Sequence, residues 1–254
     1  MTGAKITATA EIGKFGTLTE GIVVAFYNIL VGKFGLLYCL PHVLGGHDRV
    51  HIAGVERLGE KILPHMPTVD PLEFRVTAWL HNLEWCLALK EEVASSGGLR
   101  PYLRGILSQS SFDQAGRNRI IDAVLHHSKK DDDLANDSPL LTAIRIADKL
   151  DRLTPLNMMV GPTHRSDLPH YDADQPFGYQ TSKPCHLKFF FWNVEWYGML
   201  PYDWARELVD KEFFHQFLFF LRKLGRDIAE RHGIENRIEE DIRMALGSHY
   251  DKWR

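Results

Sequence analysis

Cysteine is scarce in this sequence, which limits both the redox compartment and the kind of metal site. The chain of 254 residues has three cysteines, and they lie far apart at Cys39, Cys86 and Cys185. This spacing fits neither a disulfide framework nor a zinc site of the CxxC type. Scattered, unpaired cysteines are typical of a reducing compartment, so we expect a cytoplasmic protein.

The sequence also lacks a continuous apolar segment of membrane-spanning length. Its most apolar early stretch, residues 21–40, is interrupted by Gly32, Lys33 and Gly35, whereas a transmembrane helix needs about 20 apolar residues in succession. A basic leader followed by an apolar block and a small-residue cleavage site is not seen at the start. We therefore expect a soluble protein without a membrane partner.

An excess of positive charge is missing as well. The 30 lysines and arginines are outnumbered by 33 aspartates and glutamates, which gives a formal net charge of -3. The two signs are interspersed, and no basic stripe of the kind that binds a polyanion is present. A nucleic-acid polymer is therefore not expected as a partner.

Strand-like alternation is absent, whereas helical periodicity and helix-start signals recur. Asp48 and the pairs Asp70-Pro71 and Ser138-Pro139 are typical helix starts, Ser111 is expected to cap a further helix, and Gly233 is expected to end one. The sequence thus predicts an all-α protein, with helices over residues 17–38, 48–63, 70–94, 99–107, 112–128, 138–153, 209–232 and 236–246.

The helical pattern is interrupted between residues 154 and 184, where prolines, glycines, aspartates and histidines crowd together without periodicity. Long loops of this kind within a domain tend to be lids or mobile segments. We expect one domain over residues 1–254, with a helical core over about 17–155, this loop over 154–184 and a helical extension over 185–254. The phenylalanines of residues 213–220 are compatible with a core or with a homo-oligomer interface, and both interpretations stay open.

Four short segments place metal-ligand residue types on apolar helices. Histidine and carboxylate ligands suit divalent ions such as zinc, manganese, iron or magnesium, and a helical bundle builds such a site from several helices. A buried carboxylate such as Asp148 costs several kcal/mol unless it is paired or metal-bound; an ion pair with Arg145 or Arg152 is the alternative. The segments are 47–51 (HDRVH), 78–82 (AWLHN), 124–127 (VLHH) and 147–151 (ADKLD).

Taken in order, these segments resemble the HD superfamily of metal-dependent phosphohydrolases. Residues 47–55, HDRVHIAGV, resemble the HDxxHxxxV opening of one bacterial branch, and residues 147–151 resemble its ADxLD motif. The pair His81-Asn82 stands where the family has its His-Asp doublet. The resemblance covers about residues 45–155, a little under half of the chain.

The resemblance implies an HD-domain helical bundle with additional C-terminal helices, and a phosphohydrolase acting on a nucleotide or another small phosphate ester. Asp148 and Lys149 would be the catalytic residues, because a lysine beside the ligand aspartate can contact a substrate phosphate. The cofactor implied is a divalent metal: Mn, Fe, Zn, Mg or Ni. The residues implied in binding metal are His51, His81, Asn82 and Asp148, with His126 and His127 available for a second ion.

Asn82 is the point at which the chain departs from the family pattern. The amide offers one neutral carbonyl oxygen, which brings no charge and bridges two ions poorly. Two outcomes stay open: a single, weaker metal site, or a catalytically impaired protein that binds a ligand or partner without hydrolysis. A lyase or oxygenase using iron on the same ligand set is a third interpretation.

Three further features of these segments leave alternatives open. His126 and His127 are adjacent, so only one of them is expected to face the centre, and the helix dipole alone also favours histidine at a helix C-terminus. His47 lies one turn before His51 and is expected to support it. Asp151 is expected to be exposed or ion-paired rather than catalytic.

Overall fold

The structure, a computed structural model, describes residues 18–38, 46–128, 137–158 and 167–254. Helices and turns, without strands, make up these residues, so the predicted all-α class is confirmed. The sequence predicts a loose arm over residues 1 to about 16 and a solvated loop over 129–137; the arm and most of that loop lie outside the described residues. The α-helices are α1 (Leu18–Leu37), α2 (Arg49–Ile62), α3 (Pro71–Leu80), α4 (Lys90–Ser95), α5 (Leu99–Leu107), α6 (Gln114–His126), α7 (Pro139–Arg152), α9 (His186–Gly198), α10 (Asp203–Glu207), α11 (Lys211–His232) and α12 (Ile238–Leu246).

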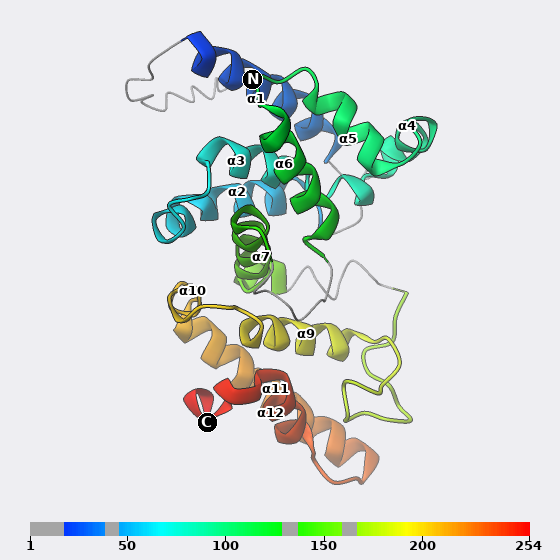
Figure 1. The fold of residues 1–254 in the computed structure, drawn as a ribbon. Coiled ribbons are helices and arrows are strands. Elements are labelled where there is room, and N and C mark those ends of the chain that lie inside the picture. The colour runs from blue at the N-terminus through cyan, green and yellow to red at the C-terminus, as the bar shows by residue number, and fades with distance from the viewer. Residues whose placement is uncertain (1–17, 39–45, 129–136, 159–166) are drawn as a thin grey trace, which may run out of the picture.

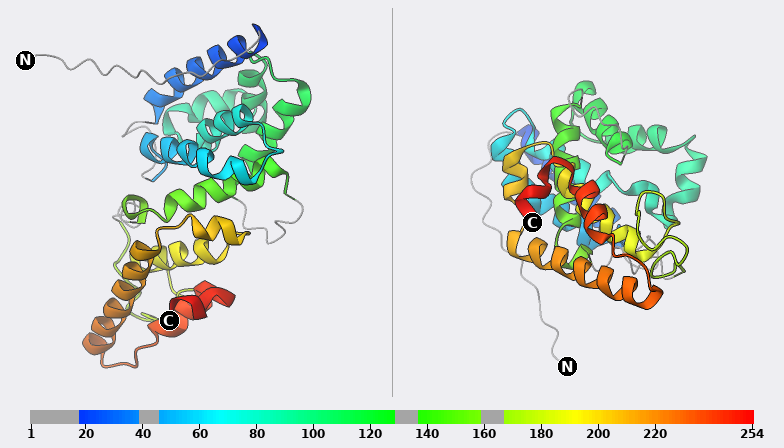
Figure 2. Two further views of the ribbon diagram at one scale, coloured as in Figure 1. Left: turned by 90° about the vertical axis from the view of Figure 1, so that its left-hand side faces the viewer. Right: turned by 90° about the horizontal axis from the view of Figure 1, so that it is seen from below.

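Helix α7 lies between two groups of helices (Figure 1). On one side it packs against α2, α3 and α6, and on the other side it contacts α9. Helix α9 packs in turn against α12, which also contacts α11. The same order is seen from a second direction in Figure 2, with α7 crossing the middle of the molecule. Among the described helices, none is both long and apolar enough to cross a membrane.

Helix α2 begins as its sequence predicts. Asp48 is the N-cap, and its Oδ1 accepts hydrogen bonds from the backbone N–H groups of Val50 and His51 at 3.0 and 3.2 Å. The buried face of the helix carries Ile52 and Val55, which are fully covered. His51 lies on the same face in the first turn, so burial of the apolar stripe also places its imidazole in the interior.

Helix α3 begins as predicted but ends much earlier. Asp70 caps it and Pro71 is its first residue, yet the helix stops at Leu80 instead of continuing to about residue 94. Short 3-10 helices over Leu83–Trp85 and Leu87–Leu89 and then α4 follow. The sequence contains no glycine or proline at this end, so propensity alone does not reveal it. As a consequence, His81 and Asn82 lie at the end of a helix rather than in its middle.

Two further helix boundaries can be compared with the expectations from the sequence, and one of them differs. Asp113, rather than Ser111, caps α6, because its Oδ1 accepts from the N–H of Gly116 at 2.6 Å. Gly233 ends α11 in the left-handed conformation, as predicted, with φ at 62°. Within the segment expected to be a loop, residues 155–158 are helical, while the described residues 167–185 form turns and bends.

Candidate metal centre

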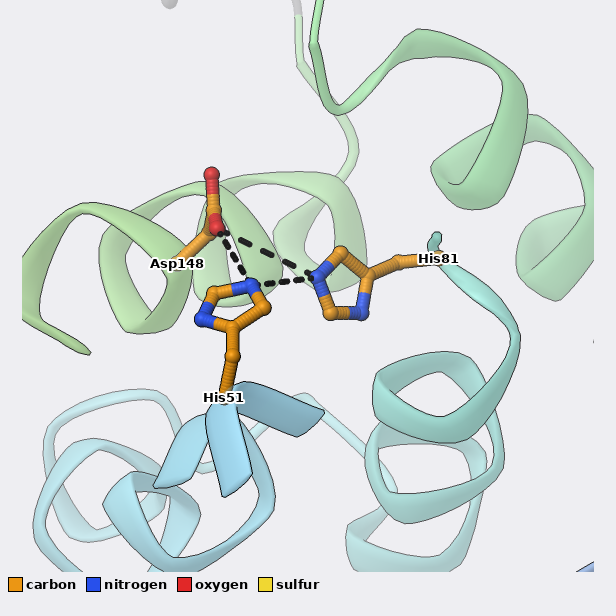
Figure 3. Close-up of side chains that lie close together, drawn as sticks. All are labelled: His51, His81 and Asp148. Carbon is orange, nitrogen blue, oxygen red and sulfur yellow. Dashed lines mark hydrogen bonds and ion pairs between the residues drawn. The ribbon is translucent and has the colours of Figure 1, made fainter. Parts of the chain in front are cut away.

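Three side chains from three parts of the chain point toward one another (Figure 3). His51 comes from α2, His81 from the residue that follows α3, and Asp148 from α7. His51 Nε2 lies 3.1 Å from Asp148 Oδ1, and the two Nε2 atoms are 3.3 Å apart. His81 Nε2 is 3.9 Å from the same carboxylate oxygen. Both histidines are buried.

The hydrogen bonds of the two histidines fix which ring nitrogen carries the proton. His81 Nδ1 lies 2.7 Å from the carbonyl oxygen of Ala78, and a carbonyl can only accept. His51 Nδ1 lies 2.7 Å from Asp151 Oδ2, which also accepts when ionised. Each Nδ1 therefore donates, and in the neutral rings each Nε2 presents a lone pair to the centre.

The resulting donor set suits a metal ion. Two atoms that are each about 2.1 Å from a tetrahedral ion lie about 3.4 Å apart, and the three observed separations of 3.1, 3.3 and 3.9 Å are centred near that value. Asp148 Oδ1 is buried and accepts no hydrogen bond. Converging lone pairs repel one another, and a cation placed between them would relieve that repulsion. His51, His81 and Asp148 thus form a group that could hold a metal ion.

The ionisation of the centre follows from burial and from neighbouring charges. Burial would raise the pKa of Asp148, but the positive charge of Arg152, whose Nε lies 3.6 Å from Asp148 Oδ1, helps to hold this pKa well below its ordinary value. Burial, reinforced by the neighbouring imidazoles of His127 and His51, holds the pKa of His81 well below 6.5. An ionised carboxylate beside a neutral His81 is the protonation state that a metal requires.

His127, and not His126, faces the cluster. The ring of His127 lies edge-on to that of His81, with centroids 5.0 Å apart, and its Nδ1 donates to the carbonyl of Val124 at 2.8 Å. Burial lowers the pKa of His127 below 6.5. In the described structure no contact joins the His126 ring to the cluster, and the backbone oxygen of His126 instead accepts from Arg145.

Asp151 supports His51 from behind. The carboxylate is buried, and its Oδ2 accepts from His51 Nδ1 and from Asn157 Nδ2, each at 2.7 Å. This close approach requires Gly54, because a Cβ at that position would lie 2.0 Å from Asp151 Oδ1. Asp151 is expected from the sequence to be exposed or ion-paired; it is buried, and its partner is the imidazole of His51, which makes an ion pair only when protonated. The supporting roles of Gly54 and Asn157 were not foreseen, although Gly54 stands one turn after His51.

Arg152 brings a positive charge to the same centre. Its Nη2 donates to His47 Nδ1 at 3.1 Å and lies 3.4 Å from His51 Nε2, and its Nε is 3.6 Å from Asp148 Oδ1. The ion pair of Asp148 with Arg152, one of the alternatives to metal binding, is therefore present. Arg145, the other cation considered, pairs with Asp137 at 2.6 Å instead. His47 stacks on Trp85 at 5.1 Å and holds Arg152 in place.

Asn82 and Lys149 are the two remaining residues that the resemblance implies in the site. Asn82 is buried, and its amide nitrogen lies 2.9 Å from His81 Nε2, so it donates to the lone pair that would face a metal. Rotation of the amide by half a turn would present the oxygen instead. Lys149 forms no ion pair with any residue that the structure describes, and burial lowers its pKa.

Comparisons with known proteins identify the fold and leave the family open. No protein-family model matches the chain, and no curated protein matches it. Among solved structures, the complex of Bacillus subtilis YpgQ with ADP aligns with a TM-score of 0.55 and 16% identity, covering 81% of this chain and 96% of that one. A structural-genomics target from Lactobacillus plantarum aligns with a TM-score of 0.58 and 17% identity, covering 85% of this chain and 100% of that one. The chain therefore has a YpgQ-like helical fold.

Proposed function

We propose that the protein is a metal-dependent phosphohydrolase of the HD type that acts on a nucleotide or another small phosphate ester. The observation that carries this proposal is the convergence of two imidazole lone pairs and one carboxylate oxygen at His51, His81 and Asp148. The order of the four motifs supports the HD assignment. The ADP bound to YpgQ, a protein of the same fold, supports a phosphate-containing ligand.

The residues around the cluster have complementary tasks in such a reaction. A divalent ion held there would act as a Lewis acid on a phosphoryl oxygen and lower the pKa of a bound water. Asp151 orients His51 and keeps its Nε2 free of a proton. The partly exposed carboxylate of Asp148 supplies the negative charge. Lys149 and Arg152 are the cations from which phosphate oxygens would receive compensating charge.

The first test is the metal content of protein purified without chelators or metal-affinity columns. About one equivalent of a transition metal per chain is expected from the three-ligand set. Asp148→Ala should lose it, whereas Asp122→Ala, which removes a carboxylate from an exposed ion pair with Arg100, should retain it. Phosphate-ester hydrolysis should follow the metal. Full hydrolytic activity in Asp148→Ala would contradict the mechanism.

A second candidate function is ligand or partner binding without hydrolysis, and two contacts favour it. Asn82 donates to the lone pair of His81, and Arg152 lies within reach of His51 Nε2 and Asp148. Together these donors engage the Nε2 atoms of both histidines without a metal, and Asp148 Oδ1 faces the positive charge of Arg152 at 3.6 Å. This function predicts no metal in the wild type after incubation with manganese, iron or zinc. It also predicts that Asn82→Asp creates metal affinity or hydrolysis that the wild type lacks.

A further inference from the structure

The helices that follow residue 154 line a partly open cavity that the metal centre does not use. Its volume is about 620 Å³, and its walls come from α9, from α11 and from the residues that follow α7. Helices α9 and α11 belong to the group that lies beyond α7 from the metal centre (Figure 1). Protein interiors contain few voids larger than a water molecule, whereas ligand pockets commonly have volumes of about 300–1,000 Å³.

One face of α11 forms a long apolar wall of this cavity. The residues that line it recur at intervals of three or four, the spacing of a single helical stripe. The opposite wall includes Met158, which follows α7, and Leu187 and Phe190 of α9. Met158 and Leu187 are buried, so the floor of the cavity is deep and apolar. The stripe on α11 consists of Phe213, Phe217, Phe220, Leu224 and Ile228.

Polar side chains also line this cavity. Arg231 follows Leu224 by two turns of α11 and is exposed, and it forms no ion pair with a residue that the structure describes. His170 and His186 line the same cavity, with their Nδ1 atoms 3.3 Å apart. Among the described residues of the lining, Asp227 is the one carboxylate. The described lining thus carries one permanent cation, Arg231, and one carboxylate, Asp227.

We propose that this cavity binds a small amphiphile with an apolar body and one anionic head. The apolar body lies along the α11 stripe, where its burial is favourable and where no polar group is left without a partner. The head lies at Arg231, whose exposed guanidinium suits a carboxylate or a phosphate. This site is separate from the metal centre and does not depend on the function proposed for it.

The test is calorimetric titration of the full chain with dodecanoate, hexanoate and dodecyltrimethylammonium, each below its micelle-forming concentration. Dodecanoate should bind at one site, with hexanoate weaker because it buries fewer methylene groups. The cationic amphiphile has the same tail length, and it should bind at least tenfold more weakly than dodecanoate. Absence of binding, or equal affinity for the two head groups, would overturn the proposal.

Two variants assign the binding to this cavity. Leu224→Trp places a larger side chain in the cavity and should abolish dodecanoate binding, with an unchanged circular dichroism spectrum as the check on folding. Arg231→Glu changes an exposed residue and should weaken dodecanoate binding at least tenfold while improving binding of the cationic amphiphile. Arg226→Glu makes the same charge change on α11 outside the lining and should bind as the wild type does. Unchanged affinity in both Leu224→Trp and Arg231→Glu would place the binding elsewhere.

A second copy of the chain is the competing occupant of the apolar stripe. Light scattering of the protein without ligand distinguishes the two. A monomer that binds dodecanoate supports the amphiphile site. A dimer that dissociates in Leu224→Trp and binds no dodecanoate would overturn it in favour of a homo-oligomer interface.

Discussion

Replacing Arg152 by leucine should tighten metal binding at the cluster of His51, His81 and Asp148. The guanidinium lies within 3.6 Å of both Asp148 Oδ1 and His51 Nε2, so a divalent ion and the arginine compete for the same donors. A unit charge about 4 Å from a divalent ion would oppose it by roughly 8 kcal/mol at an effective dielectric constant of 20. Bound metal would therefore displace the side chain rather than coexist with it.

Because the ion displaces Arg152, the free-energy cost of moving this side chain, and not the larger repulsion, determines the change in metal affinity. Moving Arg152 away breaks its hydrogen bond to His47 Nδ1 at 3.1 Å and weakens its ion pair with Asp148. A hydrogen bond that involves a charged group contributes about 1.5–3 kcal/mol. Since about 1.4 kcal/mol corresponds to a tenfold change in Kd, Arg152→Leu should bind metal roughly ten- to a hundredfold more tightly than the wild type.

The assay is calorimetric titration with Mn²⁺ and Zn²⁺ of wild type, Arg152→Leu and Arg100→Leu. Arg100→Leu removes the same charge from an exposed ion pair with Asp122, so it corrects for the change in net charge and should leave the affinity unchanged. An affinity in Arg152→Leu that is equal to or weaker than that of the wild type would refute the competition. It would then assign Arg152 a supporting role toward the ion.

Three further outcomes follow from the residues around the cluster. Gly54→Ala should lower the free energy of unfolding by about 1–3 kcal/mol, because its Cβ would collide with Asp151; Gly105→Ala, which has open space, should be neutral or stabilising in the same urea titration. Asp151→Asn should weaken metal binding about 10- to 100-fold in calorimetry, because the ring of His51 loses the carboxylate that orients it; an unchanged affinity would exclude this support. Because His81 and His127 have pKa values below 6.5 in the folded state, the unfolded chain binds more protons as pH drops through that value; the urea midpoint of metal-free protein should therefore fall as pH drops below 6.5.

The helices around the centre could be predicted where local chemistry alone determines them. Asp48, Asp70 and Ser138 each accept hydrogen bonds from the first turn of a helix, and the sequence shows these residues directly before apolar periodic segments. The end of α3 at Leu80 could not be predicted. It depends on the burial of His81 and on the hydrogen bond from its ring to the backbone carbonyl of Ala78, which are consequences of tertiary packing.

The candidate ligands were found from motif order, but their neighbours were not. His51, His81 and Asp148 come from segments that the sequence marks by residue type, and the structure brings them together. The contact of Arg152 with His47 joins residues 105 positions apart, a distance over which the sequence carries no local signal. Likewise, His126 and His127 are adjacent, so the sequence does not show which of them faces the cluster. The orientation of the end of α6 in the structure does show it.

The position of α7 links the cluster to the rest of the molecule through folding cooperativity. This helix carries Asp148 on the side that meets α2, and it also contacts α9. If α7 frays, the cluster loses its carboxylate and α9 loses a neighbour, so both should open in one unit. An ion bound at the cluster would then slow amide hydrogen exchange in α9, far along the chain from every ligand. Protection that stopped at α7 would instead identify two separately cooperative halves.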